Sequence, residues 1–246
     1  MSDITQGVDL TLPFQEGILF GNFSSADYHM RLIERTASTP SEKEKKRSLA
    51  YSHGSYDFSF ILGERIFENR SVNYTFHVHE KDYSKRKNSQ TVLENALMKQ
   101  GITQLEDTFT PNYHFVGKAM SVSTTDDHEY KRLIVSVEFD CYPFKISKIA
   151  ESSDIWDTFN FGLDVSQELT FNVQESEVIS VINAGTASVS PLITVAGSFT
   201  IQQGNQLFSF NAGTSKNEAF RLPSGENQLV INGTGAIEFD FYKELI

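Results

Sequence analysis

The sequence contains only one cysteine, Cys141, and one tryptophan among 246 residues. A single cysteine excludes an intramolecular disulfide and the cysteine-rich zinc sites that stabilise many small domains. Long apolar runs are lacking as well, since none approaches the roughly 20 residues that a membrane-spanning helix requires. The first residues, MSDITQGVDLTLPF, show no basic segment followed by an apolar one. We therefore expect no secretory signal and folding in a cytoplasm.

Charge is distributed unevenly along the chain. Residues 1–150 contain 18 Lys and Arg against 20 Asp and Glu, whereas residues 151–246 contain 3 against 12, which is most of the net charge of -11. The two basic clusters, at 43–47 and 81–87, include or adjoin acidic residues, so we interpret them as solvated loops rather than nucleic-acid contacts. The charge shift and the polar stretch 147–160 predict two domains, 1–150 and 151–246.

Apolar and polar residues alternate through much of the chain, which is the period of a half-buried β-strand. Three runs show this most clearly, with the inward residues Val72, Tyr74, Phe76 and Val78; Leu133, Val135, Val137, Phe139 and Cys141; and Ile237, Phe239 and Phe241. Pro143 has no amide hydrogen for a sheet and should end the second run. Val137, Phe139, Cys141 and Pro143 are accordingly predicted to be buried structural residues.

Turn residues divide the second half of the chain into short strands. Gly and Asn occur together at 183–185, 211–213 and 232–235, and Pro, Ser and Gly occur at 223–225. This spacing is typical of a β-sandwich. The predicted fold class is therefore mainly β, with two β-sandwich domains.

One segment, 89–100, has helical rather than strand periodicity. Its apolar positions, which should pack on a sheet, are Val92, Leu93, Ala96 and Leu97. Asn88 or Ser89 is suited to cap the start, and Gly101 suits a left-handed position after the end. We predict a single helix of about three turns in the first domain.

Residues that carry chemistry do not form a recognisable catalytic constellation. The sequence contains no G-x-S-x-G turn, P-loop or dinucleotide fingerprint. His77 and His79 project from one face of a strand and could grip a metal, but no third ligand is indicated, which favours an exposed surface. The alternation places Cys141 in the core, where a thiol behaves as a small apolar group. We predict no enzyme activity, no cofactor and no metal.

Aromatic residues of the second domain raise the alternative of a carbohydrate-binding face. The available residues are Trp156, Phe208, Phe210, Phe220 and Tyr242. Because buried phenylalanine is ordinary in a sandwich core, we interpret the phenylalanines as core.

The order of these features resembles the distal tail protein (Dit) of long-tailed phages and prophages of Gram-positive bacteria. In the first part the resemblance rests on GSYDFSFILGERIFENRSVNYTFHV (54–78), the helix 89–100 and the strand end VEFDCYPFKI. In the second part it rests on VINAGTASVSPLITVAGSFTI (181–201) and LPSGENQLVINGTGAIEFDFYKEL (222–245). The individual motifs are short, and their order carries the resemblance over nearly the whole chain.

This resemblance implies a structural role at the virion tail tip, or baseplate, after assembly in the cytoplasm of the bacterial host. The family's N-terminal domain, a β-sandwich with one helix and a long hairpin, forms a homo-hexameric ring, and its C-terminal domain is galectin-like. The ring stacks between the major tail protein and the tail-associated baseplate hub protein and can carry receptor-binding protein. Genomic DNA passes through the central channel without specific binding, and no membrane is involved.

A ring requires two different contact surfaces on each copy, and a long hairpin is suited to supply one. The span 113–140 has the pattern of such a hairpin, with a polar tip. We predict oligomer contacts at Thr125, Asp126, Asp127, His128 and Glu129. The alternative functions are a soluble carbohydrate-binding or adhesion protein built from two sandwiches and, behind it, a metal-dependent hydrolase using His77 and His79.

Overall fold

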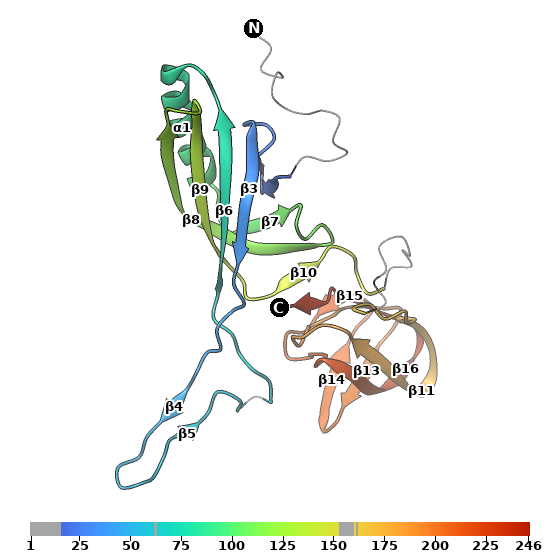
Figure 1. Ribbon diagram of the computed structural model, residues 1–246. Coiled ribbons are helices and arrows are strands. Elements are labelled where there is room, and N and C mark those ends of the chain that lie inside the picture. Colours follow the sequence, from blue (N-terminus) through green and yellow to red (C-terminus); the bar gives the residue numbers. More distant parts are fainter. Residues whose placement is uncertain (1–15, 62, 153–159, 161) are drawn as a thin grey trace. The chain divides into compact units, whose positions relative to one another are not determined.

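The computed structural model describes residues 16–61, 63–152, 160 and 162–246. The chain is mainly β, as predicted, and it divides into two compact units (Figure 1). Unit 1 contains the chain up to residue 41 and residues 68–142, and unit 2 contains 42–67 and 143–246. The boundary expected between residues 150 and 151 stays a prediction. Within the described ranges, no helix is long and apolar enough to cross a bilayer.

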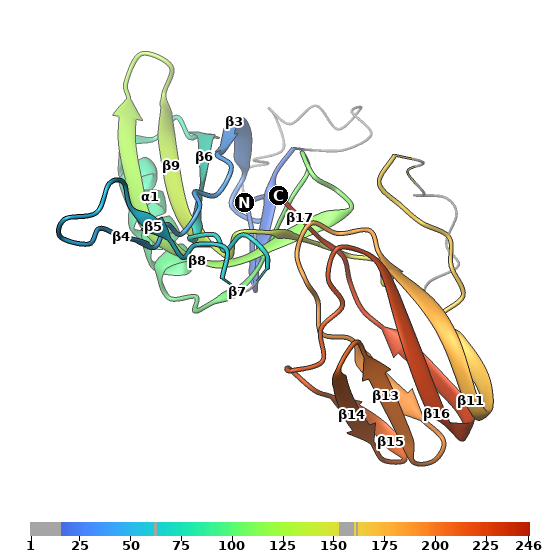
Figure 2. The same cartoon turned by 90° about the horizontal axis from the view of Figure 1, so that it is seen from below.

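In unit 1, seven strands pair antiparallel in the order β2-β1-β7-β8-β9-β6-β3. The strands are β1 (Ile18–Phe20), β2 (Phe23–Ser24), β3 (Met30–Ala37), β6 (Arg70–His79), β7 (Thr103–Asp107), β8 (Tyr113–Asp127) and β9 (Arg132–Cys141). The predicted long hairpin is formed by β8 and β9, which pair from Gly117 opposite Cys141 to Asp127 opposite Arg132. Strand β6 accompanies β9 along its whole length, from Arg70 opposite Cys141 to His79 opposite Arg132 (Figure 2).

The sheet of unit 1 closes over its own core. In Figure 1, β7 runs across the direction of β6 and β9. Phe20 of β1 contacts Phe139 of β9, with ring centroids 4.9 Å apart, although two strands separate them in the sheet order. The sheet strands and the buried residues of the helix 83–98 thus contribute to a single buried cluster.

The helix α1 (Tyr83–Met98) covers one face of this sheet but starts earlier than predicted. Asp82 is the N-cap, and its side chain accepts a hydrogen bond from the Lys85 amide at 3.0 Å. The expected caps Asn88 and Ser89 are inside the helix, so that prediction was wrong. The apolar periodicity begins only after the first turn, which is polar in sequence and is held by the cap instead.

The packing stripe and the end of α1 also differ from expectation. Leu93, Ala96 and Leu97 are buried as predicted, whereas Val92 is 52% exposed. Arg86 completes the buried face in its place. The helix ends at Lys99 in right-handed geometry, so Gly101 does not supply the expected left-handed residue.

Unit 2 contains a six-stranded sheet in the order β14-β13-β16-β12-β15, with β11 paired to β16, a separate two-stranded sheet and one further strand pair. The sheet strands are β11 (Thr170–Asn183), β12 (Leu192–Val195), β13 (Phe199–Gln203), β14 (Gln206–Phe210), β15 (Gly213–Lys216) and β16 (Gly225–Asp240). The small pairs are β4 (Lys46–Arg47) with β5 (Tyr56–Asp57), and β10 (Lys145–Ser147) with β17 (Glu244–Leu245). Figure 2 shows the long β11 and β16 side by side.

The expected turn at 232–235 is a bend within β16 rather than the end of a strand. Gly233 and Gly235 have φ of 153° and 122°, and Glu175, which pairs with Gly233 from β11, has φ of 67°. Both strands therefore change direction at one place. One half of β16 pairs with β13 and the other with β12, so a single long strand serves both parts of the sheet around one core.

Candidate functional site

The segment 42–67, here called the apolar arm, is the most unusual surface of the molecule. It contains the short β4–β5 hairpin, in which Lys46 pairs with Asp57 and Arg47 with Tyr56. The Ser59 hydroxyl accepts a hydrogen bond from the Lys45 amide at 2.7 Å, and this closes the base of the hairpin. Leu62 lies outside the described residues. Backbone hydrogen bonds from the Lys43 amide to the Ile66 carbonyl at 2.8 Å and from the Phe58 amide to the Lys45 carbonyl at 2.9 Å join the two sides of the arm.

Large apolar side chains project from the arm into solvent. Those that are exposed are Leu49, Tyr51, Tyr56, Phe58, Phe60, Ile61 and Ile66. Tyr51 makes so little contact that its exposure exceeds that of an extended reference chain, at 108%. Scattered exposed apolar residues are normal, but this many within one short segment indicates an interaction surface.

Charge on the arm differs in sign from the remainder of the chain. The arm contains five Lys and Arg and four Asp and Glu, which gives +1 and leaves -12 for the other residues. Two of the basic side chains form exposed ion pairs, Lys46 with Glu44 at 2.9 Å and Arg65 with Glu42 at 2.6 Å. These exposed pairs contribute little stability and leave the apolar side chains accessible.

The arm is anchored within unit 2 at its C-terminal side. The Glu64 carboxylate accepts hydrogen bonds from the Ser188 hydroxyl at 2.5 Å and from the Ser188 amide at 3.3 Å. Phe67 contacts Phe144 edge to face, with centroids 5.6 Å apart. The arm thus has a fixed base, while its apolar side chains remain exposed.

The predicted contact residues of the β8–β9 hairpin divide into two groups. Thr125, His128 and Glu129 are exposed. Asp126 and Asp127 instead have partners inside the subunit: Asp126 pairs with Arg86 at 2.8 Å, and Asp127 pairs with Arg132 at 2.8 Å. Two of the five predicted contact residues are therefore already engaged in ion pairs.

The pair of Arg86 and Asp126 joins the helix to the hairpin. Arg86 also donates to the carbonyl oxygens of Glu80 and Lys81, at 2.8 and 3.1 Å. Burial alone would raise the pKa of the Asp126 carboxyl, but the hydrogen bond and charge of Arg86 outweigh it and lower the pKa. Asp126 stays ionised at neutral pH and fixes the hairpin on α1.

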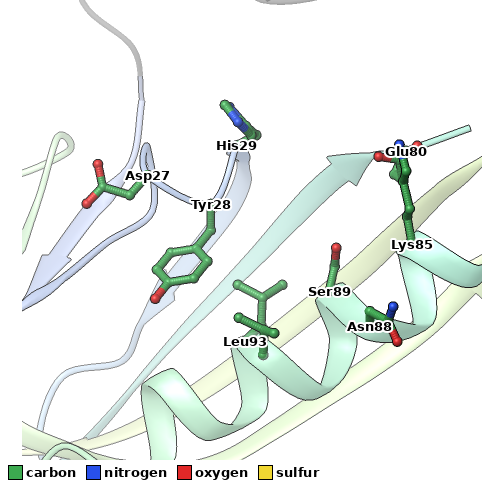
Figure 3. A pocket seen from close by; sticks show the side chains of 9 residues that line it. Asp27, Tyr28, His29, Glu80, Lys85, Asn88, Ser89 and Leu93 are labelled. Carbon is green, nitrogen blue, oxygen red and sulfur yellow. The ribbon is translucent and has the colours of Figure 1, made fainter. Parts of the chain in front are cut away.

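A shallow pocket of about 360 Å³ lies between the start of β3 and the helix (Figure 3). In Figure 3, Leu93 and Ser89 point from α1 toward Tyr28. The two carboxylates of the lining, Asp27 and Glu80, lie on opposite sides of the pocket. This arrangement does not bring a pair of acids together for catalysis.

A buried polar cluster around Asp107 was not predicted from the sequence. The Asp107 carboxylate accepts hydrogen bonds from the Tyr74 hydroxyl at 2.6 Å and from the Thr110 hydroxyl at 2.7 Å, and Arg35 lies 2.9 Å away. Burial and the Asp107 charge raise the pKa of Tyr74 far above its usual value, so the phenol remains a hydrogen-bond donor. The cluster connects β3, β6 and β7 and has a structural rather than a chemical role.

Cys141 is fully buried at the end of β9, together with Val137, Phe139 and Pro143. Burial raises the pKa of its thiol to about 12, which removes the thiolate needed for nucleophilic attack. Gly117, its partner on β8, has no room for a side chain: a Cβ there would lie 2.4 Å from the Asp140 carbonyl oxygen.

The other residues considered for chemistry are separated or occupied. His77 contacts the Arg132 guanidinium at 3.1 Å; its pKa is lowered first by burial and then by the Arg132 charge. Among the described residues, no group of three or more His, Cys, Asp and Glu could hold a metal ion. Phe208, Phe210 and Phe220 belong to the core of unit 2, Tyr242 is 45% exposed, and Trp156 lies outside the described residues.

Sequence reasoning did not identify the arm as an interaction surface. The alternation of Tyr56, Phe58 and Phe60 has the pattern of a half-buried strand. Only the first of these three residues is in a strand, and all three are exposed. Alternation shows which residues share a face, and a sheet or partner is still needed to cover that face.

The residues that the structure describes form a mainly β fold in two units, with one helix and a long hairpin in unit 1. The structure is similar to the crystal structure of SPP1 Dit (gp 19.1), described as a paradigm of the hub adsorption apparatus in phages that infect Gram-positive bacteria. The TM-score is 0.66 at 14% identity, over 94% of this chain and 99% of that chain. The chain therefore has the fold of that distal tail protein, which confirms the resemblance at the level of the fold.

Two further structures match more weakly. They are the phage P2 baseplate in its activated conformation with Ca, with a TM-score of 0.42, 9% identity and coverage of 95% and 98%, and the same baseplate with Sr, with 0.41, 9%, 94% and 97%. These TM-scores are too low to support an inference. No family model and no curated protein matches the sequence.

Proposed function

We propose that this chain is a structural hub protein in the tail tip, or baseplate, of a long-tailed phage of Gram-positive bacteria, without enzymatic activity. The observation that carries the proposal is the fold match to SPP1 Dit over nearly the full length of both chains. A match over both units supports the same overall role more strongly than a match of one sandwich, because isolated sandwiches have many functions.

In this role, six copies form a ring that stacks on the major tail protein on one side and on the tail-associated baseplate hub protein on the other. The ring can also carry a receptor-binding protein. It is assembled in the host cytoplasm and is located at the virion tail tip. Genomic DNA crosses the central channel, and a net charge of -11 disfavours retention of DNA by the wall.

The apolar arm supports assembly with further copies of the chain. Its apolar residues are exposed on one copy, and association would remove them from water. Its positive balance complements the negative balance of the other residues, so it would be attracted to a second copy rather than repelled. A head-to-tail ring uses such an asymmetric pair of surfaces.

Native mass spectrometry and negative-stain images of the purified chain test the proposal. We expect a closed ring with the mass of six copies. If only monomer is found at several salt concentrations, and also in the presence of the baseplate hub partner, the proposed role is wrong.

The exposed end of the hairpin is tested separately. Charge reversal by Glu129→Lys should shift the native mass from hexamer toward monomer if this residue contacts a neighbour. An unchanged hexamer would limit the ring contacts to other surfaces, among which the arm is the first to test.

A further inference from the structure

Three side chains of unit 2 that the proposed function does not use come together in a buried position. The Lys243 ammonium contacts the Asp164 carboxylate and lies 3.3 Å from the Glu151 carboxylate. The Lys243 and Glu151 side chains are each 5% exposed, and the Asp164 side chain is 19% exposed. A buried lysine between two carboxyl groups is uncommon, because removing charges from water is costly.

Local hydrogen bonds hold each of the three residues in place. The Ser147 amide donates to the Lys243 carbonyl at 3.0 Å, and the Glu151 amide donates to the Phe241 carbonyl at 2.9 Å. The second oxygen of Asp164 accepts a hydrogen bond from the Asn160 amide at 2.7 Å. The amine and the carboxyl carbon are thus kept adjacent, which is the main requirement for a reaction between two weakly reactive groups.

We propose that Lys243 and Asp164 become joined by an intramolecular isopeptide bond, with Glu151 as the group that transfers protons. The product is an amide between Nζ of Lys243 and Cγ of Asp164. This reaction would be a single self-modification of the folded chain, and it does not depend on the proposed tail-tip role.

Charge balance gives the order of the first steps. If all three groups were ionised, the site would contain an excess negative charge in a place of low water access. Burial raises the pKa of the Glu151 carboxyl, although Lys243 partly offsets the effect, so a neutral Glu151 relieves the excess. Burial acts in the same direction on Asp164, but the hydrogen bond from Lys243 outweighs it and lowers the pKa, so the resting state is an ion pair.

The reaction starts when Lys243 transfers one proton to Asp164, which gives a neutral amine and a neutral acid. The Nζ lone pair then attacks Cγ, the new C–N bond forms, and the carbonyl electron pair moves to oxygen. Glu151 moves a proton from the nitrogen to the departing hydroxyl group, the C–O bond breaks, and water leaves. Amine plus carboxylic acid gives amide plus one water, no electrons are exchanged, and Glu151 ends as it began.

The position of the bond suits the unit that it would close. Residues 164 and 243 are separated by 79 positions along the chain. All the strands of the six-stranded sheet, from β11 to β16, lie between them. A covalent bond between residues 164 and 243 would close a loop that contains all six strands of the sheet. A force that pulls these two residues apart would then act on the bond and would not unfold the strands between them.

The intact mass of the denatured full-length protein shows whether the isopeptide bond has formed. After any loss of the initiator methionine is accounted for, we expect the wild-type chain to be lighter than its sequence by one water molecule. Lys243→Met, Asp164→Ala and Glu151→Gln should each have the full sequence mass. A wild-type chain of full sequence mass would overturn the proposal without any variant.

A tryptic map separates this bond from other losses of water, such as succinimide formation. Joined Lys243 resists trypsin, so we expect one crosslinked species that contains residues 149–216 and 222–246. If the two peptides appear separately, or if Glu151→Gln is as light as the wild type, the assignment of the bond or of the role of Glu151 is wrong. The mass readout applies even where a variant folds poorly, because the wild type alone tests the bond.

Discussion

At the scale of single residues, polar and sulfur-containing side chains in the core of unit 1 serve packing rather than reaction. The Asp107 carboxylate is satisfied by Tyr74, Thr110 and Arg35, all from the same unit. Cys141 lies against Gly117 with its thiol protonated. Groups that are buried and fully engaged in this way are expected to affect stability and to leave assembly surfaces unchanged.

Replacing Tyr74 by phenylalanine tests the Asp107 cluster. The variant loses the donor to a buried carboxylate, so we expect the free energy of unfolding to fall by about 1–2 kcal/mol. Urea denaturation followed by circular dichroism measures this change. The control is Tyr56→Phe on the exposed arm, which should change stability little. Equal stability of the two variants would show that the hydrogen bond contributes nothing.

Replacing Cys141 by alanine or valine tests its assignment as a core residue. We expect a loss of about 1–2 kcal/mol for alanine, less for valine, and no change in the native mass. The native thiol should also react slowly with a chromogenic disulfide reagent, because a pKa of about 12 leaves almost no thiolate at neutral pH. Rapid labelling of the folded protein would contradict this assignment.

At the scale of elements, the ends and bends of helices and strands depend on a few residues whose roles differ from those that local patterns suggest. The helix is capped by Asp82, six residues before the first cap that apolar periodicity indicates. Strand β16 continues through Gly233 and Gly235 although these residues have the composition of a turn. In each case a single substitution can distinguish the role that the residue has in the structure from the role that its local sequence pattern suggests.

Asp82→Ala should destabilise α1, because the Lys85 amide loses its acceptor. We expect a cost of about 1 kcal/mol. Asn88→Ala is the matched control: Asn88 is exposed inside the helix, so alanine should be neutral or slightly stabilising. Thermal unfolding of the two variants gives the comparison. A larger loss of stability for Asn88→Ala than for Asp82→Ala would instead support a helix that starts near residue 88.

Gly233→Ala and Gly235→Ala test the bend of β16. Both residues have positive φ, so both variants acquire backbone strain. Only at position 233 would the new Cβ collide with a side chain, at 2.5 Å from the Phe199 ring, whereas the nearest atom at position 235 is 3.6 Å away. We expect Gly233→Ala to be less stable than Gly235→Ala by roughly 1–3 kcal/mol in chemical denaturation. Equal stabilities would show that the Phe199 ring moves aside easily.

At the scale of the whole molecule, the proposed ring raises the question of which surface a neighbouring copy would cover. The exposed apolar residues of the arm belong to unit 2, and the exposed end of the β8–β9 hairpin belongs to unit 1. We expect the arm to be the stronger interaction surface, because apolar area removed from water drives association more than exposed charges do.

Phe60→Glu in the arm should weaken the ring, since a charge would enter an apolar contact. We expect the dissociation constant for subunits to rise tenfold or more, about 1.4 kcal/mol, as measured by native mass over a dilution series. Leu207→Glu is the control, because Leu207 is exposed to a similar degree, 64% against 59%, but lies in the sandwich. If both variants keep the ring, or if both lose it, the arm has no special role.

The amino-acid sequence by itself determined which residues face the core of the main strands. The inward residues expected in β6, β9 and β16 are all buried, because the period of two depends only on the extended backbone. Composition likewise excluded a disulfide, and the order of motifs indicated the fold before the structure did. Each of these features depends on residues that are close together in the sequence, or on several such short patterns taken together.

Only the tertiary structure decided which charged side chains are buried and which apolar side chains of the arm stay exposed. Arg86 is buried because Asp126, 40 positions away, neutralises it, and Lys243 is buried beside Asp164, 79 positions away. The arm has a strand-like pattern but remains exposed because no sheet covers it. Burial of a charge and exposure of an apolar residue both depend on partners distant in sequence, and periodicity contains no information about such partners.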